Sequence, residues 1–319
     1  MPGLRGRVAI PGVYAFETSH TDGSLRETPV LHAASGRRAD STGRPRPRPR
    51  VVFAGDSFTY GLGVDDEETF ASVVATRLPH DRVLNAGVPG TGPDHVLRHL
   101  SAGAPYGGAR IPAETDLLVL VVYANDLADV ALGHLYRAAG DSLVPHASQD
   151  AAAATKARAA RVPGFVWLSR HSHVFNLARR VALGAIGAPA GIPAGPYATP
   201  ERERTLRAIL GALRTELHAR GTGFLVVYAP SAPEVEAAQT GMPSEDEAAV
   251  VRIAGELGLD LVSLTDTLSA SGHTVDRLYY PETHWTPRAH AVVGAWLTGE
   301  VGRRLRANAA TPAPHGSGG

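Results

Sequence analysis

The sequence predicts an α/β fold in which a parallel sheet is covered by helices on both faces. Short apolar runs alternate along the chain with longer segments whose apolar residues recur at helical spacing. The most apolar run, Leu117–Tyr123, lacks the alternating polar residues of a half-exposed strand and suits a strand buried on both faces. Strands that alternate with helices are joined by right-handed crossovers, which place the strands parallel to one another.

Five segments are predicted as strands. Each is short and apolar, rich in Val, Leu or aromatic residues, and the first is ended by Gly55. In chain order, the strands are expected at 51–54, 83–85, 117–123, 224–228 and 259–262.

Five segments are predicted as helices. Asp65 and Asp66 precede the first, where negative charge suits the helix dipole. Gly221 follows the third helix, and Pro287 begins the last, because a first-turn residue needs no N–H donor. In chain order, the helices are expected at 67–78, 94–100, 201–220, 246–257 and 287–306.

Three parts of the chain do not fit this alternation. Residues 1–50 are expected to form an irregular N-terminal lead-in. Its run 44–50 alternates Arg with Pro, cannot be helical, and is interpreted as a solvated connector rather than a nucleic-acid site. Residues 127–200 are expected to form a cap-like insertion over the functional site of a domain that spans 51–307. The Pro-, Gly- and Ser-containing end, 308–319, is expected to be a disordered tail.

Composition narrows the function classes. The chain has 319 residues, of which 44% are hydrophobic, and it carries 31 Lys and Arg against 31 Asp and Glu. This balance argues against a nucleic-acid partner, which usually requires a basic excess. The absence of Cys excludes a thiol nucleophile, disulfides and Cys-bound zinc.

The sequence also bears on location. It shows neither an apolar run of roughly 20 residues, which a membrane span requires, nor the apolar core of a signal peptide. A cytoplasmic protein is therefore expected, with secretion left open. The oligomeric state stays unknown.

The first motif is Gly55-Asp56-Ser57-Phe58-Thr59-Tyr60-Gly61, which follows the first predicted strand. In open parallel sheets, functional sites collect at the carboxyl ends of the strands. A turn at this place can expose the Ser57 hydroxyl, which becomes a good nucleophile only when a base removes its proton. Gly-Asp-Ser alone could be a simple turn, but the extended motif after an apolar strand predicts a nucleophilic serine.

Two further motifs follow the second and third predicted strands. In Asn85-Ala86-Gly87-Val88-Pro89-Gly90, the Gly90 N–H is a candidate oxyanion donor, although a plain glycine turn is the alternative. In Tyr123-Ala124-Asn125-Asp126, the Asn125 side-chain amide is a second candidate donor, although Asn-Asp turns are common at strand ends.

The fourth motif, Tyr280 to Pro287, lies just before the last predicted helix and contains Glu282 and His284. His284 is the candidate general base, since the pKa of a histidine lies near neutrality. Glu282 can hold one ring nitrogen as a donor and leave the other nitrogen to face Ser57.

These four motifs, in this order, resemble those of the SGNH (GDSL-type) hydrolase superfamily, which is named after its Ser, Gly, Asn and His. The resemblance spans about 51–306 and maps these residues onto Ser57, Gly90, Asn125 and His284. It implies a flavodoxin-like α/β/α sandwich with about five parallel strands, and no metal or organic cofactor. It also implies an oxyanion hole formed by the Ser57 N–H, the Gly90 N–H and the Asn125 side chain.

The sequence departs from the family pattern at two places. Tyr123 occupies the position of the glycine in the family's Gly-x-Asn-Asp. The family's acid is usually an Asp three residues before the His, where this chain has Pro281, so Glu282 is the nearest acid and Asp276 a weaker substitute. The Glu-x-His-Trp spacing is similar to that of the branch that includes polysaccharide O-acetyltransferases.

Three function hypotheses follow. The first is a serine esterase, lipase-like, that cleaves carboxylic esters of a small-molecule or carbohydrate substrate through an acyl-Ser57 intermediate. The second is an O-acyltransferase, of the acetyl type, in which a sugar or small-molecule alcohol replaces water. The third is a non-catalytic binding module, which predicts that Ser57 and His284 lie too far apart to hydrogen-bond.

Other readings of the sequence fit less well. The acidic run 65–68 has no His at ligand spacing and is read as a helix start rather than a metal site. Gly61-Leu62-Gly63 lacks the third glycine of a dinucleotide-binding motif. The Gly-x-Ser-x-Gly elbow of α/β-hydrolases is also absent.

Overall fold

A five-stranded parallel sheet forms the centre of the fold. Its strands are β4 (Val51–Ala54), β5 (Val83–Asn85), β6 (Leu117–Tyr123), β9 (Gly223–Ala229) and β10 (Asp260–Ser263). They lie in the order β10-β9-β6-β4-β5, and every neighbouring pair is parallel. The predicted fold class and the five predicted strands are confirmed.

The structure is a computed structural model and describes residues 6–10, 13–19, 25–31, 51–78, 83–103, 111–133, 135–140, 142–145, 196–281 and 283–310. None of the helices in these ranges combines the length and the apolar character that a membrane-spanning helix requires.

Alternation of side chains along β6 divides the apolar core into two layers. Leu117, Val119 and Val121 lie in one buried cluster, whereas Leu118 and Leu120 lie in the other. All seven residues of β6 are buried, which explains why the sequence of this strand carries no polar residue.

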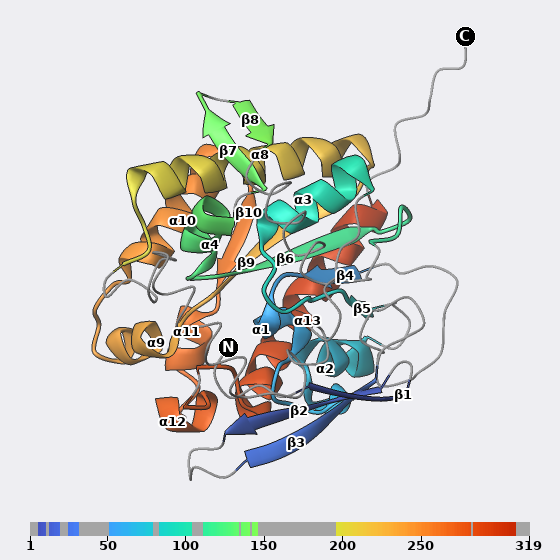
Figure 1. The fold of residues 1–319 in the computed structure, drawn as a ribbon, viewed down its shortest axis with the longest axis vertical. Coiled ribbons are helices and arrows are strands. Elements are labelled where there is room, and N and C mark those ends of the chain that lie inside the picture. Colours follow the sequence, from blue (N-terminus) through green and yellow to red (C-terminus); the bar gives the residue numbers. More distant parts are fainter. Residues whose placement is uncertain are drawn as a thin grey trace, which may run out of the picture.

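Helices cover both faces of the sheet (Figure 1). The first cluster includes side chains of α2 (Phe70–Arg77) and α13 (Pro287–Ala310), which contact each other. The second includes side chains of α3 (Pro93–Ala102), α8 (Pro200–Ala219) and α10 (Glu245–Glu256). The fold is therefore a three-layer α/β/α sandwich.

Side-chain caps fix where several helices begin. The Thr69 hydroxyl accepts from the Ser72 N–H at the start of α2, and Thr199 caps α8 ahead of Pro200. Ser244 caps α10 by accepting from the Glu247 N–H. Such caps satisfy N–H groups that have no partner within the helix, so the predicted helix starts have a local physical cause.

Shorter elements complete the domain. They are α1 (Ser57–Tyr60), η1 (Asp66–Glu68), α4 (Asp126–Gly133), β7 (Tyr136–Ala139), β8 (Ser142–Pro145), α9 (Ala232–Gln239), α11 (Thr265–Ser269) and α12 (Val275–Leu278).

The N-terminal segment differs from the irregular lead-in expected for 1–50. It contains three antiparallel strands, β1 (Gly6–Ile10), β2 (Val13–Ser19) and β3 (Leu25–Leu31). The expectation was wrong for these strands, because β2 pairs along its length with β3 and supplies the backbone hydrogen bonds that local composition does not reveal. The Arg-Pro run 44–50 lies outside the described residues.

The first part of the insertion expected at 127–200 belongs to the domain itself. Leu127 and Val130 of α4 are buried in the second cluster, and α4 contacts α8, so α4 belongs to the helical layer. The hairpin β7–β8 also contacts α8. Residues 146–195 lie outside the described residues, as does 311–319. Helix α13 continues to Ala310, into the segment expected to be a tail.

We predict that Gly87→Ala destabilises the fold by about 3 kcal/mol, the cost of severe overpacking. A Cβ at position 87 would lie 2.2 Å from the Tyr60 backbone nitrogen and 2.6 Å from the Thr59 carbonyl carbon, neither of which can turn aside. The measurement is the urea midpoint followed by circular dichroism.

Gly211→Ala is the matched control. A Cβ there meets only the Leu257 Cδ2 atom, at 3.5 Å, and position 211 lies within α8, where Ala is favoured over Gly. Its urea midpoint should stay equal or rise. Equal midpoints for the two variants would contradict the close approach at Gly87.

Candidate active site

Ser57 is the first residue of the short helix α1, three residues after the end of β4. The Asp56 side chain caps this helix, accepting from the Phe58 N–H at 2.9 Å. The Ser57 carbonyl accepts from the N–H groups of Gly61 and Leu62. These contacts fix the nucleophile candidate in a sharp strand-to-helix turn.

The order of the strands brings three of the four motifs together at the carboxyl ends of neighbouring strands. Ser57 follows β4, Gly90 follows β5 and Asn125 follows β6, and β4 lies between β5 and β6. If the five strands are numbered along the chain, their order across the sheet is second, first, third, fourth, fifth. The direction in which the chain adds strands to the sheet therefore reverses between β4 and β6. Ligands of open α/β sheets bind at such a switch point, outside the carboxyl ends of the strands.

His284 reaches this edge from the far end of the sequence. Its Nε2 atom lies 2.9 Å from the Ser57 Oγ atom, and both residues are buried. A hydrogen bond of this length is the geometry expected of a nucleophile and its base. It is also the opposite of what a non-catalytic module predicts.

The other ring nitrogen of His284 has a different environment. Its Nδ1 atom is buried and has no hydrogen-bond partner within the described part of the chain. Glu282, the predicted orienting acid, lies outside the described residues, and its role stays a prediction. Asp276 is exposed on α12. Burial lowers the pKa of His284 from 6.5 to about 4.

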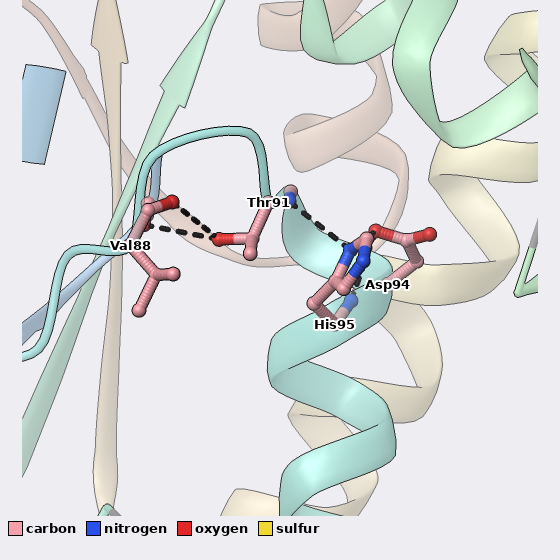
Figure 2. Close-up of polar contacts among 6 residues, drawn as sticks. Val88, Thr91, Asp94 and His95 are labelled. Atoms are coloured by element: carbon pink, nitrogen blue, oxygen red, sulfur yellow. Dashed lines mark hydrogen bonds and ion pairs between the residues drawn. The ribbon is translucent and has the colours of Figure 1, made fainter. Parts of the chain in front are cut away.

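The loop that carries Gly90 is fastened to the loop of Ser57. The Val88 N–H donates to the Gly55 carbonyl at 2.9 Å, and the Thr91 hydroxyl donates to the Val88 carbonyl at 2.8 Å (Figure 2). Gly90 lies between these residues, exposed, with a positive φ of 75°, where glycine is favoured over residues with a Cβ.

Figure 2 also shows a histidine and a carboxylate in contact beside this loop. The His95 Nδ1 atom lies 2.8 Å from the Asp94 Oδ1 atom, which also accepts from the His95 backbone N–H at 2.9 Å. Together these contacts order the first turn of α3, which follows the Gly90 loop.

Asn125 is half-buried and its amide is held by one partner. Its Nδ2 atom donates to the Asp129 Oδ2 atom at 3.0 Å, four residues later and one turn along α4. Because an amide carries two N–H bonds, the second remains available to a ligand. Sequence reasoning did not identify Asp129, although the i, i+4 spacing on a helix would have indicated this pair.

Two buried carboxyl groups lie beneath the site. Burial raises the pKa of Asp56 from 3.8 to about 7, and the nearby charge of Asp129 adds to the shift. Burial and the charge of Asp56 likewise raise the pKa of Asp126 well above its ordinary value. The Asp126 Oδ2 atom accepts from the Tyr123 N–H at 3.0 Å. Both shifts favour neutral carboxyl groups next to the nucleophile.

Among the described residues, no group of three or more His, Asp or Glu side chains is arranged to hold a metal ion. The carboxylates near the site are instead in hydrogen-bond contact with backbone N–H groups and with the side chains of Asn125 and His95.

The sequence matches no protein-family model and no curated protein sequence. Solved structures do match. A two-domain esterase active on acetylated mannans is 16% identical, with a TM-score of 0.46, over 84% of this chain; the chain spans about half, 53%, of that protein.

Two further solved structures match over most of their own length. A structure titled as a lipolytic protein of the G-D-S-L family, from Desulfitobacterium hafniense, is 12% identical over 79% of this chain and 99% of its own, with a TM-score of 0.42. An acetyl xylan esterase is 16% identical over 79% of this chain and 99% of its own, with a TM-score of 0.44.

In this chain, Ser57, Gly90 and Asn125 follow three adjacent strands of a five-stranded parallel sheet.

Proposed function

We propose that the protein is a serine esterase that cleaves carboxylic esters through an acyl-Ser57 intermediate. The observation that carries the proposal is the 2.9 Å contact between the Ser57 Oγ and His284 Nε2 atoms at the switch point of the sheet. A buried serine and a buried histidine from opposite ends of a domain have no structural need to meet in this way, since neither side chain caps a helix.

In the acylation step, the His284 Nε2 atom takes the Ser57 proton while the Ser57 oxygen attacks the ester carbonyl. The carbonyl oxygen becomes an oxyanion. Its candidate donors are the Ser57 N–H, the Gly90 N–H and the second N–H of the Asn125 amide. The Ser57 N–H belongs to the first turn of α1, where N–H groups have no acceptor within the helix.

His284 then gives the proton that it took from Ser57 to the leaving alcohol, and the tetrahedral intermediate collapses to the acyl-enzyme, which completes the first half of the reaction. In the second half, water attacks the acyl group while His284 takes a proton from the water. His284 then returns that proton to the Ser57 oxygen as the carboxylic acid leaves. Each oxyanion donor is worth about 3 kcal/mol of transition-state stabilisation. Because an oxyanion forms in both acylation and deacylation, each donor would accelerate both steps.

The protonation state of His284 fits this role. Because burial lowers the pKa of His284 to about 4, the ring is neutral at pH 7 and its Nε2 atom can accept a proton. The Ser57 hydroxyl donates to Nε2 only when the ring proton is on Nδ1. Holding that proton on Nδ1 is the role predicted for Glu282.

We predict that a fluorophosphonate probe labels the wild-type chain at Ser57, and that Ser57→Ala removes the label completely. His284→Ala should slow labelling by at least about a hundredfold, because the base no longer activates the hydroxyl. Labelling is followed by fluorescence on gels and assigned by peptide mass spectrometry. Ser101→Ala, which removes a serine on α3, should label at the wild-type rate.

The enzyme proposal fails if folded wild-type protein is not labelled at Ser57. Equal labelling of wild type and His284→Ala would remove His284 as the base.

The pH dependence of the reaction gives a second prediction. His284 must be neutral to act as base, and its pKa is lowered to about 4, so kcat/KM for p-nitrophenyl acetate should stay constant from pH 7 down to about pH 5. It should then fall tenfold per pH unit below about pH 4, while circular dichroism reports folded protein. A fall centred near pH 6.5 would contradict the buried environment of His284.

The acyl acceptor is tested by product analysis. As a hydrolase, the protein should release acetate and p-nitrophenol in equal amounts from p-nitrophenyl acetate, with glycerol or a methyl glycoside present or absent. Ser57→Ala provides the background rate. Acetylation of the added alcohol at the expense of acetate would instead identify an O-acyltransferase that uses the same residues.

A further inference from the structure

The proposed base, His284, lies in a hairpin loop ahead of α13. Tyr279 and Trp285 form an antiparallel bridge across this loop, and the Tyr280 N–H donates to the His284 carbonyl at 2.8 Å. Inside this pair, the Thr283 N–H donates to the Tyr280 carbonyl at 2.8 Å and closes a tight turn. The backbone of His284 is therefore held by the backbone of Tyr280, on the opposite side of the loop.

The Tyr280 side chain contacts the loop that follows the proposed nucleophile. Its phenol donates to the Gly63 carbonyl at 3.1 Å, and the contact is buried. The residue before Gly63 is Leu62, whose N–H donates to the Ser57 carbonyl at 3.0 Å. The carbonyl that accepts from Tyr280 thus belongs to a loop that is itself hydrogen-bonded to the backbone of Ser57.

These contacts form a closed path between the proposed nucleophile and the proposed base. One arm is the 2.9 Å hydrogen bond between the Ser57 Oγ and His284 Nε2 atoms. The other arm runs from the Ser57 carbonyl through Leu62 and Gly63 to the Tyr280 phenol, and from the Tyr280 N–H to the His284 carbonyl. In this second arm, the Tyr280 side chain supplies the link between segments 217 positions apart in the chain.

Aromatic contacts bring the same two loops together but hold them less strictly. The Phe58 ring, in the residue after the nucleophile, lies 5.3 Å from the His284 ring, and Trp285 meets Phe58 edge-on at 5.1 Å. Rings of this kind pack well over a range of offsets and distances. A hydrogen bond is directional and weakens steeply as it is bent or lengthened. The Tyr280 phenol therefore restricts sliding of the two loops that the ring contacts alone would allow.

The alignment of His284 depends on such support. Among the described residues, its Nδ1 atom has no hydrogen-bond partner, so the side chain is held by the single hydrogen bond to Ser57. A displacement of the hairpin by about 1 Å along this contact would lengthen it beyond the range of a hydrogen bond. A base that has moved by this amount takes the serine proton much less efficiently.

We propose that Tyr280 is a positioning residue whose phenol holds the loop of His284 in line with the loop of Ser57. The inference rests on the proposed function for its catalytic consequence. Tyr280 acts through the backbones of Gly63 and His284 rather than on the reacting atoms. The competing interpretation is that the buried phenol and the buried carbonyl only satisfy each other, as buried polar groups must.

The test compares Tyr280→Phe, which removes the phenol oxygen and keeps the ring, with a matched control. The control is Thr222→Val. The Thr222 hydroxyl also donates to a backbone carbonyl of a distant segment, that of Thr115, in a buried contact of 2.9 Å. Thr222 precedes Gly223, where β9 begins, so this contact lies at the end of the sheet opposite the site.

A third variant, Tyr279→Phe, tests whether any loosening of the hairpin has the same effect. The Tyr279 phenol donates to the Pro230 carbonyl at 2.7 Å, just after β9. Its removal weakens the hold on the hairpin but leaves the link between Tyr280 and Gly63 in place.

The first readout is the rate constant for fluorophosphonate labelling of Ser57, measured beside the urea midpoint. Tyr280→Phe should label about tenfold more slowly than wild type, because small displacements of a base are costly. Thr222→Val should lower the urea midpoint by a similar amount, since each variant leaves one buried carbonyl without its donor, yet label within about twofold of wild type. Tyr279→Phe should be slowed less than Tyr280→Phe.

The second readout does not depend on activity. The NMR resonance of the His284 Nε2 nitrogen, recorded at pH 7 in isotope-labelled protein, responds to the hydrogen bond that this atom accepts. Ser57→Ala gives the position of the resonance without that bond. In Tyr280→Phe the resonance should move toward the Ser57→Ala position, whereas Thr222→Val should leave it at the wild-type position.

The inference is overturned if Tyr280→Phe keeps either the labelling rate or the Nε2 resonance of wild type. It is also overturned if Tyr279→Phe or Thr222→Val changes both readouts as much as Tyr280→Phe does. If wild type itself is not labelled, the proposed function fails, and the resonance alone decides whether Tyr280 positions His284.

Discussion

The proposed chemistry depends on one contact, the hydrogen bond between Ser57 and His284, two residues 227 positions apart in the chain. The central sheet makes this contact possible. β4 presents Ser57 at the carboxyl edge, and the hairpin ahead of α13 returns His284 to the same place. Helix α13 packs against α2, and both contribute to the cluster that contains β4, so the proposed base is positioned by the same core that holds the strand of the proposed nucleophile.

Burial sets the charge state of the groups around this contact. It lowers the pKa of His284 to about 4 and raises the pKa of Asp56 to about 7, because each charged form would lose hydration in the interior. A neutral imidazole is a competent proton acceptor, and a carboxyl group with a pKa of about 7 carries less negative charge beside Ser57 than an ordinary Asp would. The same desolvation would increase the stabilisation that each N–H donor provides.

The sequence predicts the sheet and the order of its motifs well, because buried strands and capped helices are local patterns. Ser57, Gly90 and Asn125 could be placed at one edge, since each follows a strand. Contacts between distant segments could not be predicted in this way: nothing in the sequence indicates that the Phe58 ring stacks on the Tyr123 ring. Strands β1–β3 were missed for a related reason. Each is held by backbone hydrogen bonds to a neighbouring strand, and the residue composition of a segment does not reveal that pairing.

The most direct measurement is the trapping of the acyl-enzyme. Protein mixed with p-nitrophenyl acetate and quenched in acid within the first turnovers is digested and analysed by peptide mass spectrometry. The account predicts an acetyl group on Ser57 that disappears with further turnover and is absent in His284→Ala. Turnover with no acetyl group on Ser57, or with a stable acetyl group on another residue, would contradict it.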